Sequence, residues 1–399
     1  MSIAARVREL AEKYRDETAA NLGRLVRIRS VSMEEKEVNA ELARQMEAAG
    51  FDEVRIDGLG NAIGRIGSGP VVLAIDAHMD TVDVGNRDNW TFDPFVGDVV
   101  DSHVRGRGSV DQEGGAAAFV TAGRIVKELG LGDRLTLLCT GTVMEEDCDG
   151  LCWKYLVEEE GIRPDMVIST EPTNLGVYRG QRGRMEIAVS FRGVSCHGSA
   201  PERGDNAIYK ASRAALEIEA LNERLADDAF LGKGTITISE IRSGSPSLCA
   251  VADFARIHLD RRLTVGETKE SAVAEIEAIV TDLDGTVEVL HYEEEAYTGL
   301  RYGMEKYYPT WVVAADHAAV RRGVTVHEDL FGDAPRVDKW TFSTNGVTIN
   351  GCYGIPVIGF GPGNEVMAHA PDERVPVDDL VKASAFYALY ALTMALEND

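Results

Sequence analysis

The chain has 399 residues, 44% of them hydrophobic, and this length favours two domains over a single core. Its 66 acidic and 41 basic side chains give a formal net charge of -25, which argues against nucleic acids and anionic membranes as partners. The N-terminus lacks the apolar core of a signal peptide, no apolar run reaches the length of a membrane span, and the six cysteines are scattered, so we expect a cytoplasmic protein with reduced thiols.

The N-terminal part predicts two helices and two strands. Residues 4–28 carry apolar side chains at helical spacing, and residues 34–49 form a second helical pattern that ends at Gly50. Residues 51–56 alternate like a half-buried strand, whereas residues 71–75 form the continuous apolar run of a buried strand. These elements predict the start of an α/β domain.

His78 and Asp80 follow directly after the buried strand. Ligands of open α/β sheets bind beyond the carboxyl ends of the strands, so this position suits a site. One ring nitrogen of His78 can bind a metal ion while Asp80 accepts a hydrogen bond from the other and fixes the tautomer. A histidine at a strand end is also a common structural residue, so this pair alone does not define a metal site.

A glycine-rich turn at residues 106–115 surrounds Asp111 and leads into an apolar helix at 116–129. The turn lacks the residue order of a phosphate-binding loop, so we do not expect a nucleotide there. Its glycines instead permit a tight backbone around the carboxylate, which makes Asp111 a candidate site residue.

Two further buried strands also end in carboxylates. Residues 135–143 form one apolar run and are followed by Glu145 and Glu146, and residues 165–169 form another and are followed by Glu171. Strands that alternate with helices predict a mostly parallel mixed sheet covered by helices on both faces. In such a sheet these strand ends lie along one edge.

The pattern changes near residue 180. Strands and helices then follow in the order β–α–β–β–α–β, which is typical of a ferredoxin-like α+β sandwich. The segments are a strand at 185–191, a helix at 206–221, strands at 235–241 and 254–259, a helix at 267–283 and a strand at 287–291. We therefore predict an inserted domain at residues 181–293, between two parts of a catalytic domain at residues 1–180 and 294–399.

The first pattern resumes after residue 294. Residues 311–321 predict a helix, residues 357–360 a short strand and residues 377–396 a closing helix. The loop before the closing helix is rich in glycine and proline and carries His369. This part is predicted to complete the catalytic domain.

Two imidazoles and four carboxylates thus lie at strand ends and in loops. If one carboxylate bridges two metal ions and each ion takes one histidine and one more carboxylate, five side chains are ligands and one glutamate is free for proton transfer. Nitrogen and oxygen ligands without cysteine suit zinc, and manganese or cobalt is also compatible. The six residues are His78, Asp111, Glu145, Glu146, Glu171 and His369.

These residues lie in motifs that resemble, over nearly the whole chain, the dinuclear zinc amidohydrolases that include acetylornithine deacetylase, succinyl-diaminopimelate desuccinylase, aminoacylase and a glutamate-releasing carboxypeptidase. The order of the motifs is more specific than any one of them. The motifs are His78-Met-Asp80, Gly106-Arg-Gly-Ser-Val-Asp111, Glu145-Glu146, Glu171-Pro, Cys196-His197-Gly-Ser-Ala-Pro-Glu202, Gly361-Pro-Gly and His369-Ala-Pro-Asp-Glu373.

The resemblance implies a role for each site residue. His78 and Glu171 would hold one metal ion, Glu146 and His369 the other, and Asp111 would bridge the two ions. By the same resemblance Glu145 would be the general acid/base, and Asp80 would orient His78. The cofactor would be two divalent ions, with zinc the leading candidate.

The resemblance also implies a homodimer. The inserted domain would serve as a lid and dimerisation domain, and His197 would reach the active site of the partner subunit to stabilise an oxyanion. The alternative for His197 is a turn residue that caps its own loop.

Other positions depart from the family pattern and bear on the substrate. Glu113 replaces a lysine after the bridging residue, and residues 247–251 replace an Asn-Val-x-Pro segment. With the Gly180-Gln-Arg-Gly-Arg184 segment, these changes resemble a subgroup termed selenium-metabolism-linked hydrolases, a label that names no substrate. We predict substrate contacts from Arg262, which can grip a carboxylate or form a surface ion pair, and from Asn345 and Gly361.

The leading function is hydrolysis of an amide bond in a small N-acyl amino acid or related compound. A dipeptidase or exo-carboxypeptidase acting on short peptides is the alternative, because the sequence does not distinguish an acyl cap from a free α-amine. An inactive metal-binding scaffold would predict the loss of Glu145 or of a ligand, and the chain retains all of them.

Overall fold

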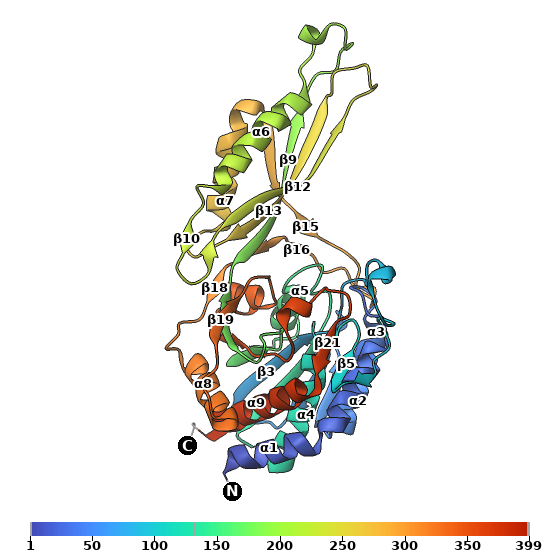
Figure 1. Cartoon of the computed structure of the whole chain (residues 1–399). Helices are drawn as coiled ribbons and strands as arrows, with labels where there is room; N and C mark the ends of the chain where they lie inside the picture. Colours follow the sequence, from blue (N-terminus) through green and yellow to red (C-terminus); the bar gives the residue numbers. More distant parts are fainter. Residues whose placement is uncertain (1, 131–132, 397–399) are drawn as a thin grey trace.

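The computed structural model describes residues 2–130 and 133–396 and has two bodies stacked along one long axis (Figure 1). The larger body, at the bottom of Figure 1, contains both ends of the described chain and a mixed sheet flanked by helices. The smaller body, at the top, is a twisted sheet with two helices on one face. Each body has its own cluster of buried apolar side chains.

A nine-stranded sheet lies at the centre of the larger body. Its inner strands β6, β3, β7 and β20 run parallel, whereas antiparallel strands lie on both sides of them. The path of the sheet is β1 (Glu53–Ile56), β2 (Ala62–Ile66), β6 (Leu135–Thr142), β3 (Val71–His78), β7 (Met166–Ser169), β20 (Val357–Gly359), β8 (Val177–Gln181) and β18 (Trp311–Val312), with β19 (Val337–Trp340) also paired to β8. The predicted mostly parallel mixed sheet is confirmed.

Helices flank this sheet and bury its apolar faces. The helix α4 packs on α9, and both contact β3 and β6. Gly115 lets the start of α4 approach the end of β7, because a Cβ on this residue would come 2.0 Å from Thr170 Oγ1. The helices are α1 (Ile3–Lys13), α2 (Arg15–Val26), α3 (Lys36–Ala48), α4 (Glu113–Leu129), α5 (Leu151–Glu158), α8 (Ala318–Phe331) and α9 (Val377–Leu396).

Helix α9 is long and apolar enough to cross a membrane by length and composition. In the structure, 78% of its apolar window is buried inside the fold, and it contacts α1, α2, α4 and α8. Its apolar surface is therefore used by the core of the larger body, as in the central helix of a globular domain.

The smaller body follows the predicted β–α–β–β–α–β order. Along its sheet the strands are β12 (Thr235–Gly244), β13 (Phe254–Leu263), β9 (Gly183–Arg192) and β14 (Gly285–Val289), all antiparallel, and β17 (Tyr307–Tyr308) also pairs with β9. Helices α6 (Ala207–Asn222) and α7 (Lys269–Val280) cover one face. The opposite face carries the polar side chains that alternate with the core residues.

Short elements complete the fold. The strands β4 (Val99–Val100), β5 (His103–Arg105) and β21 (Arg374–Pro376) form one sheet, β10 (Asp227–Asp228) pairs with β11 (Gly232–Lys233), and β15 (His291–Tyr292) pairs with β16 (Met304–Glu305). A π-helical turn spans Val347–Cys352.

Two predicted helices differ from the structure. Residues 311–321 do not form one helix: Trp311 pairs with Gln181 as part of β18 and is buried beside Trp340, and the helix begins only at Ala318. The helical stripe predicted at residues 4–28 is divided into α1 and α2 at Tyr14. In both segments tertiary burial of an aromatic side chain outweighs the local helical pattern.

Gly361 lies where the chain after β20 passes the end of β7. A Cβ at this position would come 2.1 Å from the carbonyl oxygen of Glu171 and 2.2 Å from that of Thr170. Its backbone N–H donates to Thr173 Oγ1 at 3.0 Å. Gly361 therefore sets the position of the strand end that carries Glu171, and the substrate contact predicted for Gly361 stays a prediction.

We expect Gly361→Ala to lower the free energy of unfolding by about 1 to 3 kcal/mol, because both atoms that would clash are backbone atoms. Denaturant unfolding followed by circular dichroism measures the effect. Gly244→Ala is the matched control: no atom lies within 4 Å of its added Cβ, so its stability should change by less than about 0.5 kcal/mol. Equal stabilities of the two variants would contradict this account of Gly361.

Candidate active site

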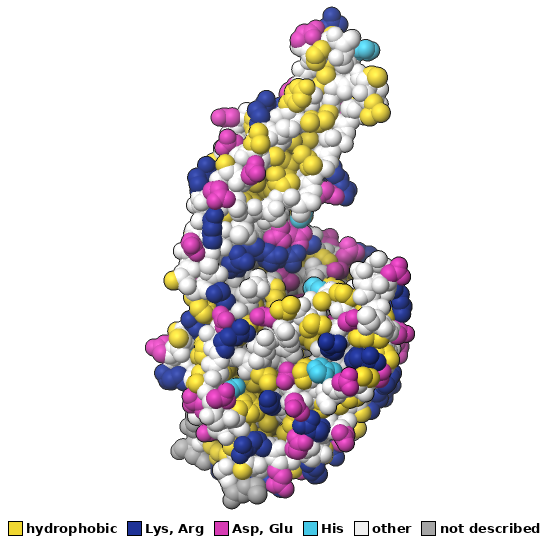
Figure 2. Space-filling model, in the orientation of Figure 1, with side chains coloured by type: hydrophobic (Ala, Val, Ile, Leu, Met, Phe, Trp, Pro, Cys, Tyr) yellow, Lys and Arg dark blue, Asp and Glu magenta, His cyan; other side chains and the backbone are white. Residues whose placement is uncertain are grey.

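A cavity of about 360 Å³ lies between the edge of the nine-stranded sheet and the base of the smaller body. Figure 2 shows the molecule hollowed between the two bodies, with Lys and Arg side chains gathered along the hollow. The lining consists mainly of charged side chains: His78, Asp111, Glu145, Glu146, Asp149, Glu171, Arg184, Arg262, Phe342, Ser343, Glu365, Ala368 and His369. All six of the predicted metal-site and acid/base residues are among them.

His78 ends β3 and is 1% exposed. Its Nδ1 lies 2.7 Å from the carbonyl oxygen of Asp80, which can only accept, so Nδ1 carries the proton in this hydrogen bond. The other nitrogen, Nε2, faces the cavity and lies 3.1 Å from Asp111 Oδ1. This tautomer leaves Nε2 as the atom that can bind a metal ion.

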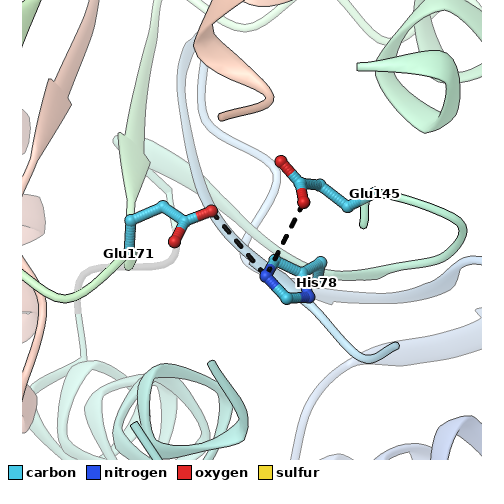
Figure 3. A group of neighbouring side chains, drawn as sticks. All are labelled: His78, Glu145 and Glu171. Atoms are coloured by element: carbon cyan, nitrogen blue, oxygen red, sulfur yellow. Dashed lines mark ion pairs between the residues drawn. The ribbon is translucent and has the colours of Figure 1, made fainter. Parts of the chain in front are cut away.

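Two glutamates point toward the same nitrogen, as Figure 3 shows. Glu171 Oε1 lies 3.8 Å and Glu145 Oε2 3.9 Å from His78 Nε2. Burial raises the pKa of both carboxyl groups well above the ordinary value. Glu145 Oε1 is buried and has no hydrogen-bond partner among the described residues, so this oxygen is free to bind a ligand or a proton.

Asp111 lies between the two imidazoles. Its Oδ1 is 3.1 Å from His78 Nε2, and its Oδ2 is 3.2 Å from His369 Nε2. Burial alone would raise the pKa of Asp111, but hydrogen bonds from His369 and His78 hold it below its ordinary value. Each carboxylate oxygen therefore faces a different histidine, which is the arrangement that a bridging ligand requires.

A buried ion pair supports Asp111 from behind. Glu373 Oε1 accepts the backbone N–H groups of Val110 at 2.8 Å and of Asp111 at 3.1 Å. The other oxygen, Oε2, lies 2.6 Å from Arg107 Nη1, and both side chains are almost fully buried. The backbone of the turn is thereby held in place by a side chain from the loop that carries His369.

His369 and Glu146 form the second half of the cluster. His369 Nε2 lies 3.0 Å from Glu146 Oε2, and hydrogen bonds to Asp111 and Glu146 raise the pKa of His369 to about 10. Burial, together with the charge of Asp111, raises the pKa of Glu146. His369 has a left-handed backbone with φ of 60°.

The carboxylate of Asp80 has a different role from the one predicted. Its nearest oxygen is 3.6 Å from His78 Nδ1, too far for a hydrogen bond. The carboxylate instead accepts the backbone N–H groups of Glu145 at 3.1 Å and of Glu146 at 2.9 Å, and the hydroxyl of Ser32 at 2.7 Å. The backbone carbonyl of Asp80 orients the imidazole, and its side chain positions the two glutamates.

The donor set fits two divalent cations. Two groups have ligand atoms within 4.8 Å of one another: His78 with Glu145 and Glu171, and His78 with Asp111 and Glu146. Four buried carboxyl groups in one cavity repel one another when ionised, and positive ions relieve that repulsion. Cations here would also replace the protons that the carboxylates draw onto the imidazoles.

Arg184 lines the cavity but was not predicted as a site residue. It lies on β9 and pairs with Asp149 at 3.3 Å and with Glu186 at 2.5 Å. The available signal was strand alternation: Met185 points into the core of the smaller body, so its neighbour Arg184 points to the opposite face. The predicted residue Arg262 also lines the cavity and is held by Asp260.

The predicted residues Asn345 and His197, like Gly361 and Asp80, are not part of the cavity lining. Asn345 is 1% exposed, and its amide is used within the core: Oδ1 accepts from Gly150 N at 3.0 Å, and Nδ2 donates to Asp76 Oδ2 at 2.9 Å. The described contacts of Asn345 are all with the core, and its predicted contact with substrate stays a prediction. His197 is exposed in the smaller body, where its Nδ1 accepts from the hydroxyl of Ser199, and no contact joins it to the metal-site residues described in this chain.

Glu113, at the position where the family pattern has lysine, is 1% exposed at the start of α4. Burial raises the pKa of its carboxyl group well above the ordinary value, and the nearby Glu373 raises it further. A buried carboxyl group with a raised pKa therefore stands behind the turn of Asp111, outside the cavity lining.

The chain has known relatives. A family model described as Peptidase family M20/M25/M40 matches residues 74–393. The chain is 54% identical over 387 residues to the uncharacterized protein YgeY of Escherichia coli (strain K12), and the matched region covers 96% of each chain. It is 29% identical over 326 residues to an acetylornithine deacetylase of Pectobacterium carotovorum subsp. carotovorum (strain PC1), covering 79% of this chain and 78% of that one.

A solved structure has the same fold. The YXEP protein of Bacillus subtilis, a dinuclear metal-binding peptidase of the M20 family, gives a TM-score of 0.71 at 12% identity over 96% of this chain and 98% of that chain. At this identity the likeness concerns architecture alone. It confirms the α/β fold class predicted for the chain.

We expect Asp111→Ala to weaken the binding of both ions, each by more than about 100-fold, because one side chain faces both halves of the cluster. Elemental analysis after dialysis measures the ion content. Asp88→Ala, in the exposed turn Arg87–Asn89, is the control and should keep the parent content. An Asp111→Ala protein that retains one full equivalent would contradict the bridging position.

Proposed function

The chain belongs to the peptidase family M20/M25/M40, and from that premise we propose that it hydrolyses the amide bond of a small N-acyl amino acid or a related compound. The observation that carries the proposal is the carboxylate of Asp111 set between two imidazoles, with Glu145 beside them. A hydrolase that relies on a pair of cations needs this combination of a shared ligand and a spare acid.

We assign His78 and Glu171 to one ion, Glu146 and His369 to the other, and Asp111 to both. This division is supported by the contacts of His78 with Asp111 and Glu171 and by those of His369 with Asp111 and Glu146. Zinc suits the mixed nitrogen and oxygen donors, and manganese or cobalt is the alternative. When bound, such ions lower the pKa of a water molecule and polarise the substrate carbonyl.

Glu145 is the proposed general acid/base. It lies in the cavity with one oxygen near His78 and the other without a hydrogen bond among the residues described. That oxygen can accept the proton of the attacking water and then donate it to the leaving nitrogen. Asp80 fixes the backbone of Glu145 and so keeps the carboxyl group at this position.

A dipeptidase or exo-carboxypeptidase is the second candidate. Glu365 lines the cavity, and its Oε2 is buried without a hydrogen-bond partner within the described part of the chain. A carboxylate in this state could hold the free α-ammonium group of a short peptide. The acyl and peptide alternatives share the same catalytic residues and differ only in this contact.

We propose that residues 181–293 form a dimerisation and lid domain between catalytic parts at residues 1–180 and 294–399, and that the protein is a homodimer. In the smaller sheet β12 is an edge strand. A groove between α6 and β12 is lined by apolar side chains such as Ile218, Ile236 and Ile238, and Leu216 beside them is 66% exposed. An open strand edge next to an apolar groove favours a second copy as the occupant.

We further propose that His197 acts in the active site of the partner subunit. Its exposed position, away from the cavity of its own chain, supports this assignment. We also propose a cytoplasmic location, supported by six free cysteines, of which Cys139, Cys148 and Cys152 are buried.

We expect Glu145→Gln to keep both ions and the fold but to lower kcat by about 100- to 10,000-fold, because the amide cannot exchange the proton. The assay uses N-acetyl, N-succinyl and N-carbamoyl amino acids and dipeptides with added zinc, manganese or cobalt. Glu159→Gln, at the exposed end of α5, is the control. Parental turnover by Glu145→Gln would remove Glu145 from this role, and turnover of dipeptides alone would favour the peptidase.

We expect complementation between two inactive variants if His197 serves the partner's site. When His197→Ala and Glu145→Gln subunits are mixed, each mixed dimer has one active site with both Glu145 and His197 intact. About half of the dimers are mixed, so about a quarter of the parental activity should return. A mixture of His197→Ala with the double variant should stay inactive. Light scattering should show a dimer that Leu216→Lys converts to a monomer. If the subunits exchange and no activity is recovered, His197 does not act in the partner's site and has a structural role.

A further inference from the structure

The chain enters a turn after β6, and this turn carries Glu145 and Glu146. Four successive backbone N–H groups of the turn, at residues 143–146, each donate to a side chain from another part of the larger body. The acceptors are Asn61 Oδ1 for Val143 at 3.1 Å, Glu35 Oε1 for Met144 at 3.0 Å, and the Asp80 carboxylate for Glu145 and Glu146 at 3.1 and 2.9 Å. Three separate segments of the chain therefore hold the path of the turn.

We propose that Glu35 is a positioning residue for the proposed hydrolysis: its carboxyl group holds the backbone of Met144 and thereby sets the direction in which Glu145 enters the cavity. The proposal rests on the proposed function, because it concerns the placement of the acid/base in that site. Glu35 lies in none of the motifs that resemble the family, and it does not line the cavity. It acts on the reaction only through the turn.

Met144 is the residue at which the path of the turn must be fixed. Its backbone is left-handed, with φ of 61°, a conformation that residues with a side chain seldom adopt. Such a conformation persists where the surrounding contacts determine it. The hydrogen bond from Met144 to Glu35 is such a contact, and Glu145 is the next residue. Loss of this bond would therefore change the direction of the backbone directly before the acid/base.

The side chain of Glu35 is not needed to begin its own helix. Glu35 is the N-cap of α3, and its carbonyl oxygen accepts from Asn39 at 3.0 Å, but its side chain makes no capping hydrogen bond. Glu35 is instead fully buried, with 0% exposure, where burial and the nearby charge of Asp80 raise its pKa to about 8. Burying a carboxyl group beside another costs free energy, which the hydrogen bond to Met144 partly offsets. A residue that only began the helix would keep its carboxyl group in water.

Glu35 can be substituted without changing a residue assigned to the ions. Asp80 also holds the turn, but its backbone carbonyl orients His78, so a substitution there affects an ion ligand directly. Within the described chain, no hydrogen bond or ion pair joins the Glu35 side chain to any of the five assigned ligands. A substitution of Glu35 therefore reports on the turn alone.

The test measures turnover by the zinc-loaded protein with the best substrate of the N-acyl amino acid and dipeptide series. We expect Glu35→Leu to lower kcat by about 10- to 100-fold and to leave KM within about threefold, because Glu145 is displaced while the rest of the cavity lining is unchanged. Glu35→Gln should recover kcat to within about threefold of the parent, since its side-chain carbonyl oxygen can still accept from Met144. If Glu35→Leu turns over as fast as Glu35→Gln, Glu35 does not position the acid/base.

Leu330→Ala is the control for a loss of stability alone. Leu330 is buried in α8, within the apolar core of the larger body and outside the cavity lining. Its truncation destabilises the fold, but kcat below the unfolding transition should stay within about twofold of the parent. A loss of kcat in Leu330→Ala equal to that in Glu35→Leu would contradict the proposal. If Glu35→Leu does not fold, Glu35→Met replaces it, because the unbranched methionine side chain adapts better to the same space.

Two measurements without turnover separate this proposal from the proposed function. Hydrogen exchange at the Met144 amide should be at least about tenfold faster in Glu35→Leu than in the parent, and unchanged in Glu35→Gln. Chelator competition should show that Glu35→Leu binds one zinc ion about tenfold more weakly or worse, because Glu146 follows in the same turn. If the parent hydrolyses none of the amides, the proposed function fails, and these two results still support the position of Glu35. Equal exchange and equal zinc affinity in the three proteins would overturn it.

Discussion

The position of Asp111 between two imidazoles is the constraint on which the site depends. His78 comes from the end of a central parallel strand, and His369 comes from a loop close to the end of the chain. One carboxylate can face both only if the long segment between them folds back to the same sheet edge. The buried pair of Glu373 and Arg107 links the loop of His369 to the turn of Asp111, so the two halves of the cluster are held in register.

Electrostatics explains why such a site must be built from the whole fold. Four buried carboxyl groups share one cavity, and burial raises the pKa of three of them, Glu145, Glu146 and Glu171. No local segment would keep these groups together in water. The rigid sheet supplies that position, and cations offset the repulsion. Arg184 and Arg262 approach the same cavity from the other body, where they pair with Asp149, Glu186 and Asp260.

Much of this could be predicted from the sequence. Buried strands are continuous apolar runs, and parallel strands end at one edge, so the residues that follow them were expected to meet. His78, Glu145 and Glu171 are such cases. The core hydrogen bonds of Asn345 and the cavity position of Arg184 were not predicted, because both depend on contacts between segments far apart in the sequence. Asn345 donates to Asp76 in the core, and Arg184 reaches Asp149 of the larger body. The helix predicted at residues 311–321 was wrong for the same reason, because Trp311 pairs with Gln181 of β8.

The carboxylate of Asp80 has a consequence for how this site can vary. It accepts the N–H groups of two successive residues, Glu145 and Glu146, one assigned to proton transfer and the other to ion binding. Both functions depend on the hydrogen bonds of the Asp80 carboxylate, so a substitution of Asp80 shifts Glu145 and Glu146 together. A change that alters the pKa of Glu145 and leaves the position of Glu146 unchanged must therefore act on the surroundings of the Glu145 side chain, such as its packing. It cannot act through the backbone that the two residues share.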